Sequence, residues 1–583
     1  MNNGCKKTVM WSVLFLILLA LSCMMGGEQK LPANQSLLLV GEVKGKGDPA
    51  QYAYENYAFA CIAIANGNHE EAEIYLKEAL KNDKDSPYLL MKLTEVLIEN
   101  AKMEEALLCA QKTVDRTPDD LKAREFLANV YARLEEFGLA ISQYQEILKR
   151  DPGDKDVRLH LTRLFIRMKK YDDALDELSI LTENEPELII AHYYKGRINL
   201  ELKEYDSARE AFLRALAIDS RFLPALSGLA ALYSEIDEVD MAIETYRKIL
   251  LFYPTNTVAR ERLIALYYKT GQEKLAEDSM EDMKRVFSPG DLERKRLGLI
   301  YLRYGKLNES IEELKAIVAA WPDDQEARYY LGAALEESGD LAEAYESFEL
   351  IDSTSSYFKN ARMHMAYILE RQERLDEAID LLRETINHEG DNPRLYLMLS
   401  SLYEIKEEYH SALDILKEGL EYNDRNTRLL YRLGIVLDKL RRNEECLQHM
   451  EMVIEIDPRH ADALNYIGYT YAEKGIYLDR ALELIERAIE YKPNSGYIID
   501  SLGWVYFRKG QYERALEELK KAVTLCPEDP TINEHLGDVY FKKEDYGEAL
   551  KIYKRALSLK NADDERLKGK INEVMDRLKG NVP

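Results

Sequence analysis

The chain has 583 residues, of which 46% are hydrophobic and 32% are charged, and it contains only 29 glycines and 16 prolines. This composition, with helix-forming residues throughout, favours a long all-helical array over a mixed fold. The net charge of −26 argues against nucleic acid or an anionic membrane as the main partner of the body of the chain, and it keeps an extended protein soluble.

The segment 1–23 is predicted to be a signal peptide. Lys6 and Lys7 form a positively charged start, and Val9 to Leu21 is an almost unbroken apolar run. Such a run is short for a transmembrane helix and typical of a signal-peptide core. It ends in Leu-Ala-Leu-Ser-Cys at positions 19–23, where a small residue directly precedes Cys23. This ending resembles the bacterial lipobox.

The lipobox resemblance implies that Cys23 becomes the lipidated first residue of the mature protein. Ala20 stands where the family usually has leucine, so simple secretion and an uncleaved anchor remain alternatives. Met24, rather than aspartate, implies sorting to the outer membrane with the protein facing the periplasm. Residues 24–52 are expected to form a tether between the lipid anchor and the folded part.

A 34-residue repeat runs through the rest of the chain. A small residue recurs at one position in successive segments, and only the step from Cys446 to Ala481 is longer, by a single residue. The members are Ala72, Ala106, Ala140, Ala174, Ala208, Ala242, Ala276, Ser310, Ala344, Ala378, Ala412, Cys446, Ala481, Ala515 and Ala549. A glycine stands twelve positions earlier in several segments, as in Gly196 and Gly537, and proline closes many of them, as in Pro118 and Pro527.

These recurring positions share a physical cause. Two antiparallel helices approach closely only where side chains are small, so we expect the glycines of the first helix to face the alanines of the second. Proline cannot donate a backbone hydrogen bond, so it ends the second helix and turns the chain into the next unit. No single hairpin buries its apolar face alone, and stacking of hairpins supplies the core.

The pattern resembles the tetratricopeptide-repeat (TPR) family over residues 53–563, most closely from Leu502 through Ala515 to Pro527. The resemblance implies an all-α solenoid of about fifteen helical hairpins, wound into a right-handed superhelix, in a protein that binds other proteins. Residues 564–583 have helical spacing and polar character, and are expected to supply a capping helix over the last repeat and a short tail.

No catalytic motif is recognisable. The sequence contains no HExxH, Walker, GxSxG or Rossmann pattern, and its nine histidines are scattered. The four cysteines beyond the leader, Cys61, Cys109, Cys446 and Cys526, lack metal-site spacing and are expected to pack inside repeats. We therefore predict no catalytic residues, no metal, no cofactor and no small-molecule substrate.

The first helix of each hairpin lines a concave groove in the TPR family, which the resemblance carries over to this chain. In the late repeats this stripe comprises Tyr469, Asp500, Trp504, Phe507, Arg508, Asp538, Phe541 and Lys542. Exposed rings are costly unless something covers them, so we predict a peptide-binding strip here. The alternative is that the rings pack against the neighbouring hairpin or the capping helix.

A second candidate patch lies in the early repeats. It comprises Asn129, Arg133, Arg163, Arg167, Tyr193 and Arg197. Arginine suits bidentate capture of carboxylates, which favours a binding role. Pairing with neighbouring glutamates is the alternative. The middle repeats present an acidic wall that is expected to be solvated, consisting of Glu336, Glu337, Glu370, Glu404 and Asp438.

These observations predict a non-catalytic scaffold or adaptor of the bacterial cell envelope. It would be tethered to the outer membrane by lipid and would bind segments of other envelope proteins in its groove. An adaptor that recruits peptidoglycan or polysaccharide enzymes is the alternative, and a secreted periplasmic location is the alternative to anchoring. A catalytic envelope protein would need a site outside the repeats.

Overall fold

The computed structural model describes residues 49–388, 390, 392–560 and 564–580, and these residues form 31 helices and no strand. A division between Tyr253 and Pro254 separates two compact units. The predicted signal peptide, Cys23 and the tether up to residue 48 lie outside the described residues.

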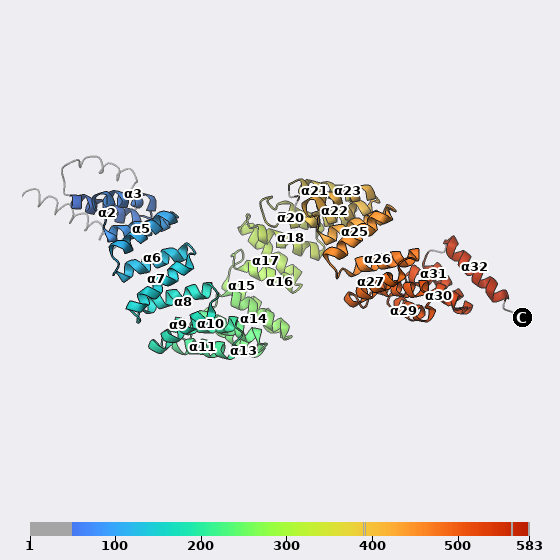
Figure 1. Cartoon of the computed structure of the whole chain (residues 1–583), viewed down its shortest axis with the longest axis horizontal. Helices are drawn as coiled ribbons and strands as arrows, with labels where there is room; N and C mark the ends of the chain where they lie inside the picture. Colours follow the sequence, from blue (N-terminus) through green and yellow to red (C-terminus); the bar gives the residue numbers. More distant parts are fainter. Residues whose placement is uncertain (1–48, 389, 391, 561–563, 581–583) are drawn as a thin grey trace, which may run out of the picture. The chain divides into compact units, whose positions relative to one another are not determined.

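The first unit contains six helical hairpins, coloured blue to green in Figure 1. Its helices are α2 (Pro49–Ala65), α3 (His69–Asn82), α4 (Pro87–Glu99), α5 (Met103–Arg116), α6 (Leu121–Arg133), α7 (Phe137–Arg150), α8 (Lys155–Arg167), α9 (Tyr171–Asn184), α10 (Ile189–Glu201), α11 (Tyr205–Ile218), α12 (Leu223–Glu235) and α13 (Val239–Phe252).

The second unit contains nine hairpins and a final helix, coloured green to red in Figure 1. Its helices are α14 (Thr257–Lys269), α15 (Glu273–Val286), α16 (Arg294–Arg303), α17 (Leu307–Ala320), α18 (Gln325–Ser338), α19 (Leu341–Glu349), α20 (Phe358–Arg371), α21 (Leu375–His388), α22 (Pro393–Ile405), α23 (Tyr409–Tyr422), α24 (Thr427–Lys439), α25 (Asn443–Ile456), α26 (Ala461–Lys474), α27 (Leu478–Tyr491), α28 (Gly496–Arg508), α29 (Tyr512–Leu525), α30 (Pro530–Lys542), α31 (Tyr546–Leu559) and α32 (Glu565–Gly580).

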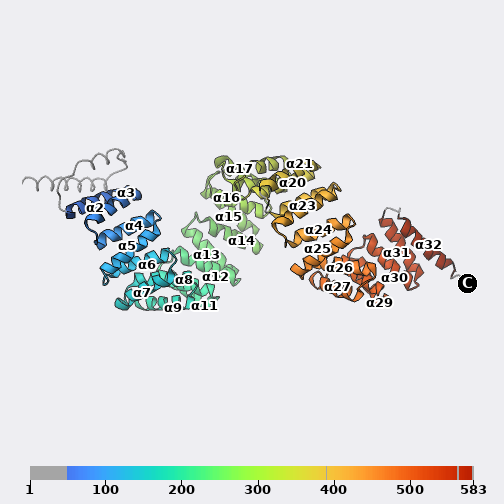
Figure 2. The same cartoon turned by 45° about the horizontal axis from the view of Figure 1, so that its top comes forward.

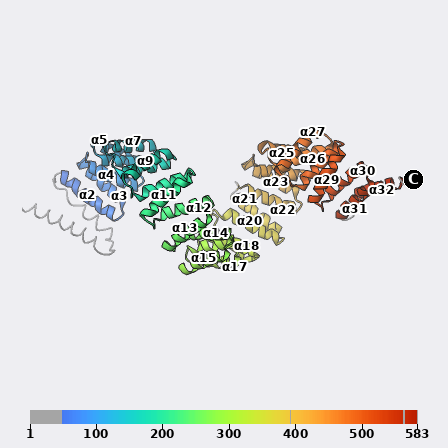
Figure 3. The same cartoon turned by 90° about the horizontal axis from the view of Figure 1, so that it is seen from below.

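Within each unit, the two helices of a hairpin pack on each other and the second helix packs on the first helix of the next hairpin. Figures 2 and 3 show the same neighbours along the chain from two further directions. Buried side chains fill the spaces within and between hairpins. The prediction of an all-α solenoid with fifteen hairpins and a capping helix is confirmed for the described residues.

The 34-residue repeat is also visible in the backbone conformation of the hairpin turns. Each turn contains a residue with positive φ, such as Glu135 (63°), Lys169 (57°) and Gly271 (70°). Nine of the fifteen repeat-spaced residues are not glycine, although the left-handed conformation costs a residue with a Cβ about 1–2 kcal/mol. Local backbone hydrogen bonds at the end of the first helix offset this cost, as from the N–H of Glu136 to the carbonyl of Tyr131 (3.0 Å).

The prolines end the second helices as predicted. Pro118 and Pro152 each lie two residues beyond the end of such a helix. The proline carbonyl then accepts a hydrogen bond from a side chain six residues later, as from Arg158 to Pro152 (2.9 Å) and from Arg328 to Pro322 (2.7 Å). This bond fixes the entry of the next hairpin.

The expected partner of the glycines was wrong. A Cβ at Gly196 would lie 2.6 Å from the ring of Phe212, and a Cβ at Gly537 would lie 2.5 Å from the ring of Tyr553. These rings stand sixteen residues after the glycine, whereas the alanine column stands twelve residues after it. The glycine therefore makes room for a large side chain of the second helix, while the fully buried alanines, such as Ala208, allow the close approach of the helices.

Of the four described cysteines, Cys446 is buried and Cys61 is exposed. The expectation that all four pack inside the repeats is therefore wrong for Cys61, which lies on the solvent-facing side of the first described helix. Among the helices described between residues 49 and 580, none has the length and apolarity needed to cross a membrane.

Candidate peptide-binding groove

A cavity of about 640 Å³, which we call the early groove, is lined by residues of the first four hairpins. Four residues of the predicted early patch line it: Asn129, Arg133, Arg163 and Arg167. The other two, Tyr193 and Arg197, are not part of the lining. Tyr193 packs edge-on against Phe222 of a neighbouring hairpin (ring centroids 5.8 Å apart), and Arg197 is exposed on α10.

The arginines of the early groove differ in how their charge is balanced. Arg167 pairs with Glu135 at 2.6 Å, and its guanidinium lies over the ring of Phe137. Arg163 donates from Nε to the hydroxyl of Tyr194 at 3.2 Å and has no carboxylate partner among the described residues. Arg133 makes no hydrogen bond or ion pair with any described residue. Pairing with glutamate, the alternative to a binding role, thus applies only to Arg167.

The floor of the groove is ordered by a buried tyrosine from the second helix of the third hairpin. Tyr144 on α7 donates its hydroxyl to Asn129 Oδ1 at 2.6 Å, and the ring of His160 stacks on it at 5.9 Å. Apolar lining is supplied by Phe126, Leu164 and Ile98, among others. The groove therefore combines a partly apolar floor with cationic side chains.

Several polar lining residues were not predicted from the sequence, among them Glu95 and Glu99 on α4, His69 at the start of α3 and His160 on α8. Glu95 and Glu99 stand 34 residues before Asn129 and Arg133, at the same two positions of the preceding repeat. Applying the predicted groove positions to that repeat would have found them. The Nδ1 atom of His69 is shielded from solvent and has no hydrogen-bond partner among the described residues.

The late stripe is organised differently, around what we call the late cluster: Asp500, Trp504, Phe507 and His535. The side chain of Trp504 is only 7% exposed. Its ring stacks on His535 of the next hairpin (4.1 Å) and on Phe507 (4.8 Å), and its Nε1 donates to Glu473 at 2.9 Å. The expectation that this ring is exposed was wrong, because the next hairpin covers it.

Asp500 is also buried and has a hydrogen-bond partner within the protein. Its carboxylate accepts a hydrogen bond from Nδ1 of His535 at 2.9 Å, and both residues are buried. Burial by itself lowers the pKa of His535, but the adjacent Asp500 carboxylate outweighs this effect and the pKa is raised. Tyr469 lies beside the same imidazole, with ring centroids 6.3 Å apart, and is half-buried.

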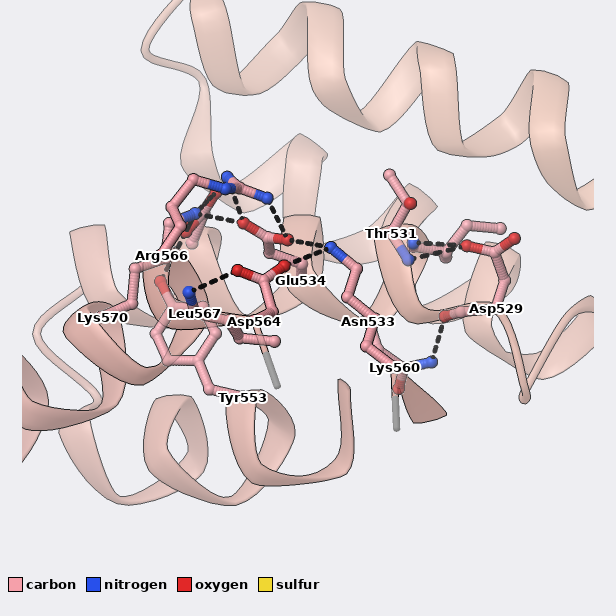
Figure 4. A network of polar contacts seen from close by, with 12 residues as sticks. Asp529, Thr531, Asn533, Glu534, Tyr553, Lys560, Asp564, Arg566, Leu567 and Lys570 are labelled. Carbon is pink, nitrogen blue, oxygen red and sulfur yellow. Dashed lines mark hydrogen bonds and ion pairs between the residues drawn. The ribbon is translucent and has the colours of Figure 1, made fainter. Parts of the chain in front are cut away.

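Asp538 is covered by the capping helix. It accepts hydrogen bonds from the Tyr553 hydroxyl and from Lys570 of α32, the latter at 2.6 Å. Lys570 and Arg566 also bind Glu534, in the network drawn in Figure 4. Burial favours the neutral form of Glu534, but these cations hold its pKa below the usual range. The carboxylates of α30 therefore anchor α32.

The remaining residues of the late stripe keep some exposure. Arg508 and Lys542 keep part of their surface in solvent, while Phe507 and Phe541 are half-buried. Each phenylalanine packs beside the first residue of its second helix, as in the 5.7 Å contact of Phe541 with Tyr546. The eight predicted residues are thus not brought together as one open strip, and peptide binding by the exposed ones stays a prediction.

The acidic wall of the middle repeats is only partly solvated. Glu336 bonds to His364 at 2.7 Å and Glu404 bonds to Arg432 at 2.7 Å. Each partner lies on the first helix of the next hairpin. The expectation of a solvated wall was therefore wrong for Glu336 and Glu404, which are half-buried and connect successive hairpins. Asp438 is exposed, but it also accepts a hydrogen bond from Tyr466 of the next hairpin (2.7 Å).

No group of three or more His, Cys, Asp or Glu side chains is arranged to hold a metal ion in the described part of the chain. Family models described as tetratricopeptide repeat match residues 63–130, 161–221, 295–357 and 531–563, and a model described as TPR repeat matches residues 503–543. The chain carries tetratricopeptide repeats. The resemblance seen in the sequence is thereby confirmed for its repeats.

A TPR repeat-containing protein of Pseudomonas aeruginosa is 39% identical over 62 residues, which are 11% of this chain and 10% of that protein. The chain thus matches about a tenth of the length of this curated relative. Among solved structures, MamA from Desulfovibrio magneticus RS-1 is 25% identical, with a TM-score of 0.26, over 30% of this chain and 97% of that one.

Two further structures cover other shares of the chain. A TPR protein from Parabacteroides merdae is 19% identical with a TM-score of 0.34, over 43% of this chain and 98% of its own. The Cut9-Hcn1 hetero-tetramer structure is 15% identical with a TM-score of 0.36, over 83% of this chain and 96% of that one. With TM-scores below 0.5, these matches carry no functional information.

The TPR solenoid is the type of fold that serves as a scaffold for protein–protein interaction. In this chain the early groove is built mainly by the first helices α4, α6 and α8, on the surface where the TPR resemblance places a groove. Its arginines have two features of a binding site: they line a cavity, and two of them carry charge that no glutamate among the described residues balances.

Proposed function

We propose that this protein is a non-catalytic interaction scaffold of the bacterial cell envelope, held at the periplasmic face of the outer membrane by lipid on Cys23. In this proposal the early groove holds a segment of another envelope protein. Recruitment of peptidoglycan or polysaccharide enzymes is one form that such scaffolding takes.

One observation carries the proposed binding role: Arg133 lines a cavity and has no partner among the described residues. An arginine that served packing alone would bury its stem and pair its guanidinium, as Arg158 does with Glu177 and the Pro152 carbonyl. A cavity of this volume lies in the range that ordinarily accommodates ligands.

Crosslinking in intact cells tests the binding role. A photo-reactive phenylalanine in place of Ile64, which lines the early groove, should form adducts with a discrete partner protein. The matched control is the same probe at Ile74, which is 62% exposed on the next helix of the same hairpin. Ala132→Trp, which fills the groove, should remove the adduct at position 64. Equal labelling from both positions, or adducts that survive Ala132→Trp, would contradict the proposal.

The envelope location rests on the leader: two lysines, the short apolar run and the Ser22-Cys23 junction. Labelling cells with radioactive palmitate should mark the wild-type protein and leave Cys23→Ala unlabelled. Cys5→Ala is the matched control and should be labelled like the wild type. Label in Cys23→Ala, or none in the wild type, would show that the protein is not a lipoprotein at Cys23.

A further inference from the structure

Successive hairpins place opposite charges in the same column of the early groove. Glu99 on α4, Arg133 on α6 and Arg167 on α8 occupy the same position of successive repeats, and all three line the cavity. No ion pair joins Glu99 to Arg133, and neither has another charged partner among the described residues. The cavity is therefore anionic at α4 and cationic at α6 and α8.

The side chains between and around these charges are apolar. Phe126 and Leu164 lie on the same helices as the arginines, and Ile98 lies beside Glu99. Every basic residue of the lining other than histidine is an arginine. Arginine is more weakly hydrated than lysine and binds carboxylates through two parallel hydrogen bonds, so it suits a site that a ligand partly desolvates.

Resting on the proposed function, we propose that the occupant of the early groove is an extended protein segment with charges of both signs. Its carboxylates bind Arg133 and Arg163, a basic side chain binds Glu99, and an apolar side chain between them covers Phe126 and Leu164. Each charged side chain of the segment is thus paired with an unbalanced charge of the cavity, and its apolar side chain contacts the apolar lining.

A phosphate-rich ligand fits this cavity less well. Glu99 has no cationic partner among the described residues and repels phosphates, whereas the charge of Glu95 is balanced by Lys92 (2.7 Å). The chain as a whole has a net charge of −26. Nucleic acid also carries no cationic group that could pair with Glu99. A bipolar peptide satisfies both the carboxylates and the arginines, which inorganic phosphate or a nucleic acid cannot do.

Titration of the detergent-solubilised full chain with a blocked nonapeptide tests the proposal. The peptide carries a lysine near one end, a leucine at the centre and two glutamates near the other end. Replacing the glutamates by glutamines should weaken binding at least about tenfold, because each charge-assisted hydrogen bond is stronger than its neutral counterpart. Replacing the lysine by glutamate should also weaken binding, by a smaller factor.

Reversing the charge of a groove arginine tests which end of the peptide binds the arginines. Arg163→Glu should weaken binding of the bipolar peptide about tenfold or more. The same variant should bind more tightly a peptide in which lysines replace the two glutamates. Arg214→Glu makes the same change of charge at an exposed site on α11 outside the cavity, and should leave both peptides as in the wild type. Equal binding of both peptides to Arg163→Glu, or tighter binding of inorganic phosphate than of the peptide, would overturn the proposal.

The outcome separates this proposal from the function on which it rests. If groove adducts form in cells at position 64 while the peptides bind without charge preference, the scaffold function stands and the ligand class is wrong. If neither the adducts nor peptide binding is observed, the early groove is not a binding site and both proposals fail.

Discussion

Asn129 in the first unit and Asp538 in the second stand at the same position of their hairpins, and each accepts a hydrogen bond from a tyrosine fifteen residues later. Their surroundings differ. Lys570 of the capping helix binds Asp538 at 2.6 Å and closes over it. Asn129 lines an open cavity, together with arginines of its own and the next hairpin.

Two further residues at this same position of the repeat show the same contrast. Arg163 and Trp504 occupy equivalent positions, and each contacts a residue at the equivalent place on the following hairpin. His535 stacks on the ring of Trp504, which is buried, whereas Tyr194 bonds only to Nε of Arg163, and Arg163 stays exposed. A groove position stays open only where the side chain from the next hairpin does not cover it.

The largest effect is expected from Trp504→Ala. Truncating a buried aromatic side chain costs about 3–5 kcal/mol, and the local unfolding of α28 to α31 should become easier by that amount. Trp321→Ala is the matched control, since that ring is 51% exposed, and it should cost less than about 1 kcal/mol. Hydrogen exchange of the α28 and α30 amides measures the cost of Trp504→Ala, and exchange of the α16 and α17 amides measures the cost of Trp321→Ala. A cost for Trp504→Ala no larger than the control's would show that the late cluster is not a core.

The ion pair of His535 with Asp500 should make the late repeats sensitive to pH. The pKa of His535 is raised in the folded state, so its stabilising contribution is complete below about 6.5 and is lost as pH rises through the folded-state pKa. Unfolding of α28 to α31 should therefore become easier above about pH 6.5, by roughly 1–3 kcal/mol.

Chemical unfolding followed across pH 5–9 measures this dependence. His535→Gln should flatten the profile, whereas His160→Gln, in the first unit, should leave the late repeats unchanged. A profile in His535→Gln that keeps the wild-type slope would assign the pH dependence to other groups.

A moderate effect is expected at the capping helix. Lys570→Ala removes the cation shared by Glu534 and Asp538, and should loosen α32 by about 1–2 kcal/mol. Lys579→Ala removes the same charge from the same helix, but Lys579 faces only the exposed Asp576, so this variant should have little effect. Proteolysis rates at residues 564–580 report the difference. Equal rates in the two variants would argue against the network as the anchor of α32.

The smallest effect on stability is expected in the early groove. Arg133→Ala removes a side chain with no partner among the described residues, so its cost should stay within about 0.5 kcal/mol. A melting temperature of the first unit equal to that of the wild type is the expected result. A clear fall would reveal a structural contact for Arg133 and weaken its assignment as a binding residue.

The sequence predicted the repeat unit because its cause is local and periodic. Small residues at Ala208 and its equivalents, and prolines such as Pro152, act within one hairpin or at its end, so spacing alone reveals them. It did not predict the burial of Trp504, because the covering residue, His535, belongs to the next hairpin. The sequence analysis identified Arg133 and Arg163 but missed Glu99, although all three occupy repeat positions that line the early groove.

The sequence by itself determined the all-α architecture and the number of hairpins, since these follow from the composition and the 34-residue spacing. The helix faces expected to line a groove came from the resemblance to the TPR family. Only the tertiary structure decided which of those faces are open. Whether a groove side chain such as Arg163 or Asp538 is free depends on the size and charge of what the next helix lays over it. That pairing acts across hairpins through space, so no single repeat contains it.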